Sequence, residues 1–108
     1  MKLLIPLVMF VLFTVGNVAW AADAKAGKTV YDSKCKTCHG AGGEGNAALA
    51  KTLKVEFKHL GSKEVQAKTD DQLKKESTAG IGKMQPVKGL SDTQVQDVIA
   101  FLRTLAKS

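Results

Sequence analysis

Two cysteines and a histidine stand close together in the stretch K-C-K-T-C-H-G at residues 34–40. Cys35 and Cys38 are the only cysteines of the chain, and His39 follows the second one directly. This Cys-x-x-Cys-His spacing is typical of covalent haem attachment. Each thiol can form a thioether with one haem vinyl group, and the next residue can bind the iron through its imidazole. The motif predicts one covalently bound haem c, attached at Cys35 and Cys38, with His39 as an iron ligand.

Three other kinds of site use part of this motif. A redox dithiol normally follows a strand in a thioredoxin-like domain, and no strand pattern precedes Cys35. A zinc site needs two further ligands, and beyond His39 only His59 and carboxylates remain, at no familiar spacing. A disulfide across two residues closes a small, strained loop. The haem interpretation uses all three residues and is preferred.

A second iron ligand is sought among the remaining sulfur and imidazole groups. Met84 is the only methionine after residue 21, and it lies in G-K-M-Q-P-V-K-G. Gly80, Gly82 and Pro86 around it indicate a loop between two helices, where a methionine has little reason to fill a core. We predict Met84 as the second ligand. The alternatives are His59, as one of two histidine ligands, and an open or water-bound iron.

The N-terminal segment reads as an export signal. Lys2 precedes an apolar run from Leu3 to Val15, and Ala19-Trp20-Ala21 matches the small-x-small pattern of a signal-peptidase site. We predict a signal peptide at residues 1–21, cleavage after Ala21, one domain at residues 22–108, and a periplasmic (extracytoplasmic) location. The alternative is a retained anchor, because Leu3 to Ala22 is uncharged for 20 residues.

Charge and apolar content restrict the partners and the core. Residues 22–108 hold 15 of the 16 basic residues and all 10 acidic ones, a net charge of +5. Arg103 is the only arginine, which argues against nucleic-acid recognition. The positive surface predicts redox partner proteins with acidic docking patches, and contact with membranes only through partners unless the signal is retained. Only 17 of these 87 residues are Leu, Ile, Val or Phe. So few apolar side chains form a small core, and we expect a cofactor inside it.

The patterns beyond the motif predict an all-α fold. A first helix is expected over about Asp23–Ser33, and a short helix over A-A-L-A-K-T-L. Two further helices should start at Thr69 and Ser91, each with a glutamine three residues later as in a capping box. The helix that starts at Thr69 should end near Ala79. The last helix carries an amphipathic stripe at three- and four-residue steps, formed by Val95, Val98, Ile99, Leu102 and Leu105.

Taken together, the Cys35–Gly40 motif, the G-K-M-Q-P loop and the terminal D-V-I-A-F-L-R resemble class I monohaem c-type cytochromes of the small bacterial periplasmic type. The resemblance covers residues 22–108. It implies a small cytochrome c fold with crossing N- and C-terminal helices and a covalent haem in the core. It also implies that Gly27 and Tyr31 meet Val98 and Phe101, and that His39 and Met84 are the two iron ligands.

In one respect the sequence departs from this family. The family often has a proline after the motif, whose carbonyl accepts the N–H of the proximal histidine, whereas H-G-A-G-G-E-G-N-A-A-L contains none. An acceptor for His39 is still expected, because it fixes the ring and raises its basicity.

The expected function is that of an electron carrier and not an enzyme. It would shuttle single electrons between redox partners through the His/Met-ligated haem, inside an apolar shell of Tyr31, Leu49, Leu53, Phe57, Val98 and Leu102. Lys34, Lys36, Lys83 and Lys88 are expected to ring the exposed haem edge. One alternative is a haem sensor in which CO or NO displaces Met84. Another is a peroxide-reducing enzyme, for which His59 is the only candidate base.

Overall fold

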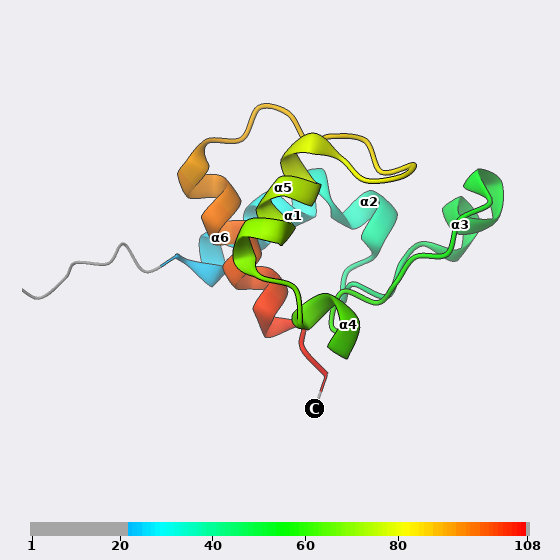
Figure 1. Cartoon of the computed structure of the whole chain (residues 1–108), viewed down its shortest axis with the longest axis horizontal. Helices are drawn as coiled ribbons and strands as arrows, with labels where there is room; N and C mark the ends of the chain where they lie inside the picture. The colour runs from blue at the N-terminus through cyan, green and yellow to red at the C-terminus, as the bar shows by residue number, and fades with distance from the viewer. Residues whose placement is uncertain (1–21, 108) are drawn as a thin grey trace, which may run out of the picture.

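The computed structural model describes residues 22–107 and arranges them as six α-helices (Figure 1). Within this range there is no β-strand, only an isolated bridge between Ile81 and Met84. The all-α prediction is therefore confirmed. The helices are α1 (Ala24–Lys34), α2 (Lys36–His39), α3 (Ala47–Leu53), α4 (Lys63–Gln66), α5 (Asp70–Ala79) and α6 (Asp92–Thr104).

The N-terminal helix α1 and the C-terminal helix α6 cross in direct backbone contact (Figure 1). At the crossing, a Cβ added to Gly27 would lie 1.8 Å from the carbonyl oxygen of Asp97 and 2.9 Å from the amide nitrogen of Val98. Only glycine permits this approach. One turn later the ring centroids of Tyr31 and Phe101 are 4.9 Å apart. The expected meeting of these two helices is confirmed.

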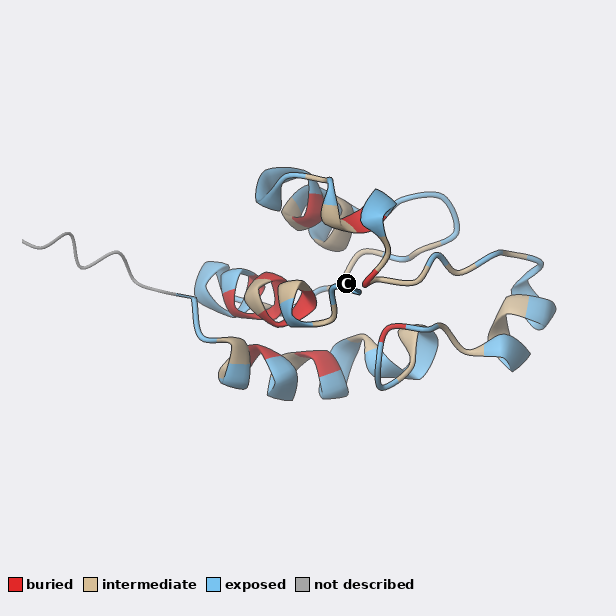
Figure 2. Cartoon of the chain, turned by 90° about the horizontal axis from the view of Figure 1, so that it is seen from below, coloured by how far each residue is buried: buried red, intermediate tan, exposed pale blue. Residues whose placement is uncertain are grey.

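The buried core gathers on the side of the molecule where α1, α5 and α6 face one another (Figure 2). Helix α6 supplies most of it, because its apolar residues recur at three- and four-residue steps and form one stripe. The buried apolar residues are Tyr31, Val65, Leu73, Val95, Val98, Ile99, Phe101 and Leu102.

Local capping determines where α5 and α6 begin. The hydroxyl of Thr69 accepts the Gln72 amide N–H while the Gln72 side chain accepts the Thr69 N–H, and Ser91 and Gln94 do the same for α6. Both predicted capping boxes are confirmed. Gly80 ends α5 with φ 81°, a value that suits glycine.

The shorter helices differ from the core elements. Helix α3 was expected, and it lies at the end of an excursion away from the other helices (Figures 1 and 2). The excursion is closed at its base where the Leu60 amide donates to the Gly43 carbonyl at 3.0 Å. Leu53, at the end of α3, is 40% exposed. Helix α4 was not predicted.

None of the helices between residues 22 and 107 is long and apolar enough to span a bilayer. The predicted signal peptide at residues 1–21 lies outside the described residues.

Candidate haem site

The three motif residues lie within one short stretch of chain. Helix α2 follows α1 directly, and Cys35 is at once the last cap of α1 and the first cap of α2. The side chain of Cys35 packs against the core, whereas Cys38 is exposed; both thiols are free. Burial, with a smaller contribution from Cys38, raises the pKa of the Cys35 thiol to about 11. The two thiols therefore stand in different surroundings although they are one helical turn apart.

The carbonyl groups at the end of α2 are bound by the loop that follows. The Asn46 side-chain amide donates to the Thr37 carbonyl at 3.2 Å, and the Asn46 backbone amide donates to the Cys38 carbonyl at 2.8 Å. The Gly45 amide donates to the His39 carbonyl at 2.7 Å. Helix C-termini leave such carbonyls without intrahelical partners. The loop thus fixes the backbone conformation of the motif.

Asn46 also makes hydrogen bonds at the start of α3. Its side-chain oxygen accepts the amides of Ala48 and Leu49 at 3.0 and 3.2 Å, as an N-cap does. One side chain therefore connects the end of α2 to the beginning of α3. The sequence analysis did not single out Asn46, and the signal that could have found it is an asparagine directly before a short helical pattern.

A fourth carbonyl, that of Gly40, is bound by the phenol of Tyr31 at 2.5 Å. Burial is the main cause that raises the pKa of Tyr31 to about 12, with the carboxylate of Glu44 among the lesser ones. Tyr31 is 0% exposed. The hydroxyl therefore stays protonated over the working pH range and keeps this hydrogen bond.

The His39 imidazole is half-buried beside Phe57, with ring centroids 5.7 Å apart. Burial lowers the pKa of His39 and so favours the neutral ring, which is the form that binds metals. The Nδ1 atom is buried and has no hydrogen-bond partner among the described residues. The expected acceptor for this atom is therefore not found there. Buried polar atoms normally have a hydrogen-bond partner. A histidine that is kept at this position to bind a metal would explain the exception.

Met84 lies half-buried in the loop between α5 and α6. Its backbone exchanges two hydrogen bonds with Ile81, of 2.9 and 3.2 Å, and so closes a four-residue turn. A Cβ on Gly80 would lie 2.6 Å from the Met84 carbonyl oxygen, so the turn packs closely on the end of α5. The Val87 amide then returns to the Ser77 carbonyl at 2.8 Å. The loop thus has a defined backbone.

The predicted site residues therefore fall into two groups. The structure brings Cys35, Cys38 and His39 together on one turn and places Met84 in a separate loop. No described hydrogen bond or ring contact joins that loop to the motif. His59 lies elsewhere, and its Nδ1 accepts the Gly61 amide at 2.9 Å. The four lysines expected near the haem edge, Lys34, Lys36, Lys83 and Lys88, are all exposed.

Free thiols one turn apart, followed by a neutral half-buried imidazole, suit covalent haem attachment. Comparison with known proteins agrees with this chemistry: the family model for cytochrome c matches residues 24–106. The chain belongs to the cytochrome c family. The family carries covalently bound haem c with its iron, one per chain in monohaem members, and the chain is an electron-transfer cytochrome.

Relatives within the family are similar over most of their length. The cytochrome c6 of Picosynechococcus sp. is 34% identical over 115 residues, covering 100% of this chain and 97% of the relative. Cytochrome c-554(547) of Halothiobacillus neapolitanus is 34% identical over 90 residues, covering 79% of this chain and 99% of the relative. The solved structure of the KustC0563 c-type cytochrome superposes with a TM-score of 0.65 at 27% identity, covering 75% of this chain and 98% of that one. The predicted class I cytochrome fold is thus confirmed.

Proposed function

We propose that this cytochrome is an exported carrier of single electrons whose iron is bound by His39 and Met84. Thioethers at Cys35 and Cys38 would hold the haem. The observation that carries the proposal is the pair of hydrogen bonds between Ile81 and Met84, which hold the methionine backbone in a closed turn. A closed turn limits the movement of the Met84 backbone, which favours a ligand that stays bound over one that is displaced.

The haem supplies an iron centre that takes up and returns one electron. The chain's residues adjust this centre. The thioether of Met84 is a soft, weakly basic donor and favours the reduced iron, which raises the reduction potential relative to two histidine ligands. The neutral ring of His39, favoured by burial, is ready to bind without first losing a proton.

The backbone around the motif favours transfer with little rearrangement. Four successive carbonyls, from Thr37 to Gly40, are bound by Asn46, Gly45 and Tyr31. Because both the motif and the Met84 turn are held by hydrogen bonds, the ligands should keep their positions in both oxidation states.

Two exposed apolar residues with lysines near them form the proposed contact with redox partners. Leu53 and Ile81 are the large apolar residues exposed in the described chain, at 40% and 51%. Lys83 joins their segments, because its ammonium group donates to the Leu53 carbonyl at 2.7 Å. Lys51 and Lys54 lie next to Leu53 and are exposed. A partner with an acidic rim and an apolar centre would fit this surface, and the association should weaken with salt.

Export is part of the proposal. Cleavage after Ala21 would release residues 22–108 into the periplasm, where thioethers keep the cofactor from being lost. We propose a carrier and not an enzyme; in support, His59, the candidate base for peroxide chemistry, already accepts a hydrogen bond from its own loop at Gly61.

The test is one optical titration of the haem-loaded protein: oxidised, reduced, and reduced with CO. A six-coordinate low-spin spectrum that does not change with CO and shows the methionine–ferric charge-transfer band is expected. A high-spin spectrum, or a prompt shift on CO, would favour the alternative in which CO or NO displaces Met84, and the carrier proposal would then fail.

A further inference from the structure

Asp97 is a charged residue in the buried interface between α1 and α6. It is 9% exposed and is the one charged residue among the buried ones of the described chain. One carboxylate oxygen accepts the backbone amide of Asp23 at 2.8 Å. None of the ion pairs found among residues 22–107 includes Asp97. A carboxylate that is largely withdrawn from water normally has a cation beside it.

The hydrogen bond from Asp23 does not by itself require a charge at this position. The amide oxygen of an asparagine would accept the same N–H without the cost of burying a carboxylate. The presence of aspartate and not asparagine at position 97 is therefore best explained by a positive group close to it in the mature protein.

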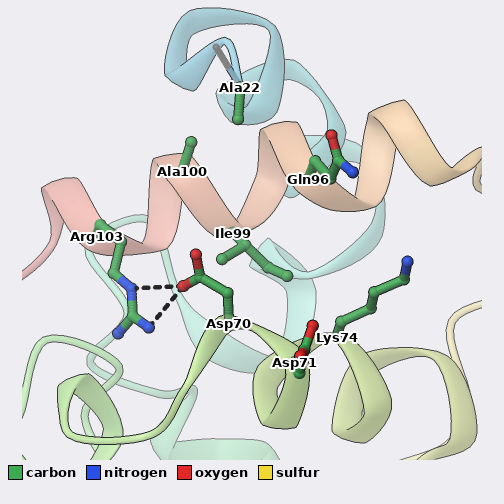
Figure 3. A pocket seen from close by; sticks show the side chains of 8 residues that line it. All are labelled: Ala22, Asp70, Asp71, Lys74, Gln96, Ile99, Ala100 and Arg103. Atoms are coloured by element: carbon green, nitrogen blue, oxygen red, sulfur yellow. Dashed lines mark hydrogen bonds and ion pairs between the residues drawn. The ribbon is translucent and has the colours of Figure 1, made fainter. Parts of the chain in front are cut away.

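Ala22 places a candidate positive group within reach. Bond lengths keep successive backbone nitrogens within about 3.7 Å of each other, so the Ala22 nitrogen lies within about 6.5 Å of the Asp97 oxygen that binds Asp23. Opposite charges at roughly 4–6 Å favour each other's charged forms. Ala22 is exposed and also lines a cavity of about 290 Å³, where it lies over α6 beside Ala100 (Figure 3).

The other charges around this cavity are accounted for or exposed. Arg103 binds Asp70 at 2.7 Å, as Figure 3 shows, and Lys74 lies 3.8 Å from Asp92. Asp71 is exposed at the cavity wall. On α1, the Asp23 carboxylate accepts the amides of Lys25 and Ala26, and Lys28 pairs with Asp32. The cavity lining holds two carboxylates and two cations, which balance in number, so the additional buried carboxylate of Asp97 gives the surroundings of Ala22 a negative charge.

We propose that removal of the leader creates the cation that Asp97 requires: the α-ammonium group of Ala22 pairs with the Asp97 carboxylate and fastens α1 to α6. This rests on the proposed cleavage after Ala21. Signal peptidase adds water across the Ala21–Ala22 bond, the carboxylate leaves with Ala21, and the amine of Ala22 takes up a proton. Leader removal thereby completes the contact between the terminal helices.

The pairing predicts a direction for the pH dependence. An α-ammonium group ordinarily has a pKa of about 7.7–8.0, and a neighbouring carboxylate raises the pKa by favouring the charged form. The stabilisation is then fully present below the ordinary pKa and is lost as the pH rises through the raised value. Asp70, Asp71 and Asp97 would act in the same direction, whereas Lys74 and Arg103 oppose it.

The experiment is a double-mutant cycle on four exported, haem-loaded proteins. One change inserts Gly-Gly between Ala21 and Ala22, which keeps the ammonium but moves it two residues away from Asp97. The other is Asp97→Asn, which keeps an acceptor for Asp23. In the native-length protein, Asp97→Asn should lower the Tm by several degrees at pH 6 and by much less at pH 10. In the Gly-Gly protein it should change the Tm little at either pH.

The matched control is Asp71→Asn, which removes an exposed, solvent-screened carboxylate from the same cavity and should show much weaker coupling. Equal effects of Asp97→Asn in both backgrounds, or equal coupling for Asp71→Asn, would overturn the pairing. Mass spectrometry of each protein separates the two proposals. In the native-length proteins, a mature N-terminus other than Ala22 overturns the cleavage and the pairing together, whereas Ala22 without coupling overturns only the pairing.

Discussion

Tyr31, on the N-terminal helix, donates its phenolic hydrogen to the carbonyl oxygen of Gly40, the residue directly after the haem-binding motif. The same ring packs against Phe101 of the C-terminal helix. One side chain therefore links the crossing of the terminal helices to the backbone that presents His39. The stability of the helix pair and the conformation of the motif should depend on each other through this residue.

Replacing Tyr31 with phenylalanine tests this link. The ring packing is retained but the hydrogen bond is lost, and we expect unfolding to become easier by about 0.5–1.5 kcal/mol. Gly43 also donates to the Gly40 carbonyl, at 3.3 Å, so that oxygen keeps a partner. Chemical denaturation measures the change. A loss above several kcal/mol would mean that the ring itself had moved.

The same tyrosine predicts a response at high pH. Because the pKa in the folded protein is raised from 10.0 to about 12, the stabilisation is full below pH 10 and disappears as the pH rises toward 12. Tyr31 is the only tyrosine of the chain, so tyrosinate absorbance reports on it alone. The difference spectrum against Tyr31→Phe should show a midpoint well above that of the denatured protein; coincident midpoints would contradict the burial.

Gly27→Ala tests the helix crossing. Alanine favours a helix over glycine by about 1 kcal/mol, so a net loss can only come from the contact. The new Cβ would lie 1.8 Å from the Asp97 carbonyl oxygen, and we expect destabilisation by about 1–3 kcal/mol. Gly42→Ala is the control, because its Cβ would meet only the end of the Glu44 side chain, at 3.1 Å. Equal thermal stability of the two variants would argue against close packing at Gly27.

Met84→Ala tests the proposed iron ligand. Loss of the thioether should lower the reduction potential and open the iron to CO, because methionine favours the reduced state. Ile81→Ala is the matched control: it lies in the same turn, is 51% exposed and keeps its backbone hydrogen bonds. Spectroelectrochemistry compares the two. If both variants have the potential of the parent protein, Met84 is not a ligand.

Arg103→Lys tests the connection between the C-terminal end of α6 and the segment 66–70. The guanidinium donates to the backbone carbonyls of Gln66 and Lys68, at 3.0 and 2.7 Å, and to the Asp70 carboxylate. A lysine cannot reproduce this planar set of donors, so we expect a loss of about 1–3 kcal/mol. Asp70→Asn should cost less than 1 kcal/mol, because the Asp70 side chain is 72% exposed. The reverse order in thermal melts would mean that the ion pair matters more than the backbone bonds.

Asn46 allows its two roles to be separated. Asn46→Ser keeps an oxygen to cap α3 but removes the amide that donates to Thr37, whereas Asn46→Ala removes both. We expect the alanine variant to lose about 1 kcal/mol more than the serine variant. Hydrogen exchange of the Ala48 and Leu49 amides locates the effect. Faster exchange in both variants would show that the Thr37 bond also supports α3.

The features predicted correctly from the sequence are those encoded over a few residues. Thr69 with Gln72, and Ser91 with Gln94, carry the whole signal for a helix start within one turn, and both starts are confirmed. The helix crossing at Gly27 was predicted from family resemblance and not from periodicity, because a single small residue does not indicate which segment packs against it. Helix α4 was missed because four residues with one buried side chain, Val65, leave no periodic pattern.

Long-range side-chain roles were beyond reach of the sequence for a different reason. Arg103 is the only arginine and still gave no hint that it binds residues 66–70, since hydrogen bonds between distant segments depend on the completed fold. The iron ligands His39 and Met84 stay predictions. They were inferred from residue chemistry. Spacing along the sequence does not fix where a loop lies in the fold, as the excursion that carries α3 illustrates.

The pairing of the first and last helices also governs when the protein can fold. Five of the eight buried apolar residues belong to α6, so the core cannot close until the end of the chain has been synthesised. Contacts between the two ends of a chain form late, because the intervening loop must close first. Cys35 and Cys38 precede α6 in the chain, and both can be reached before the last helix docks on the first. Cys38 stays exposed in the folded chain, whereas Cys35 packs against the core that α6 completes, so docking of the last helix restricts access mainly to Cys35.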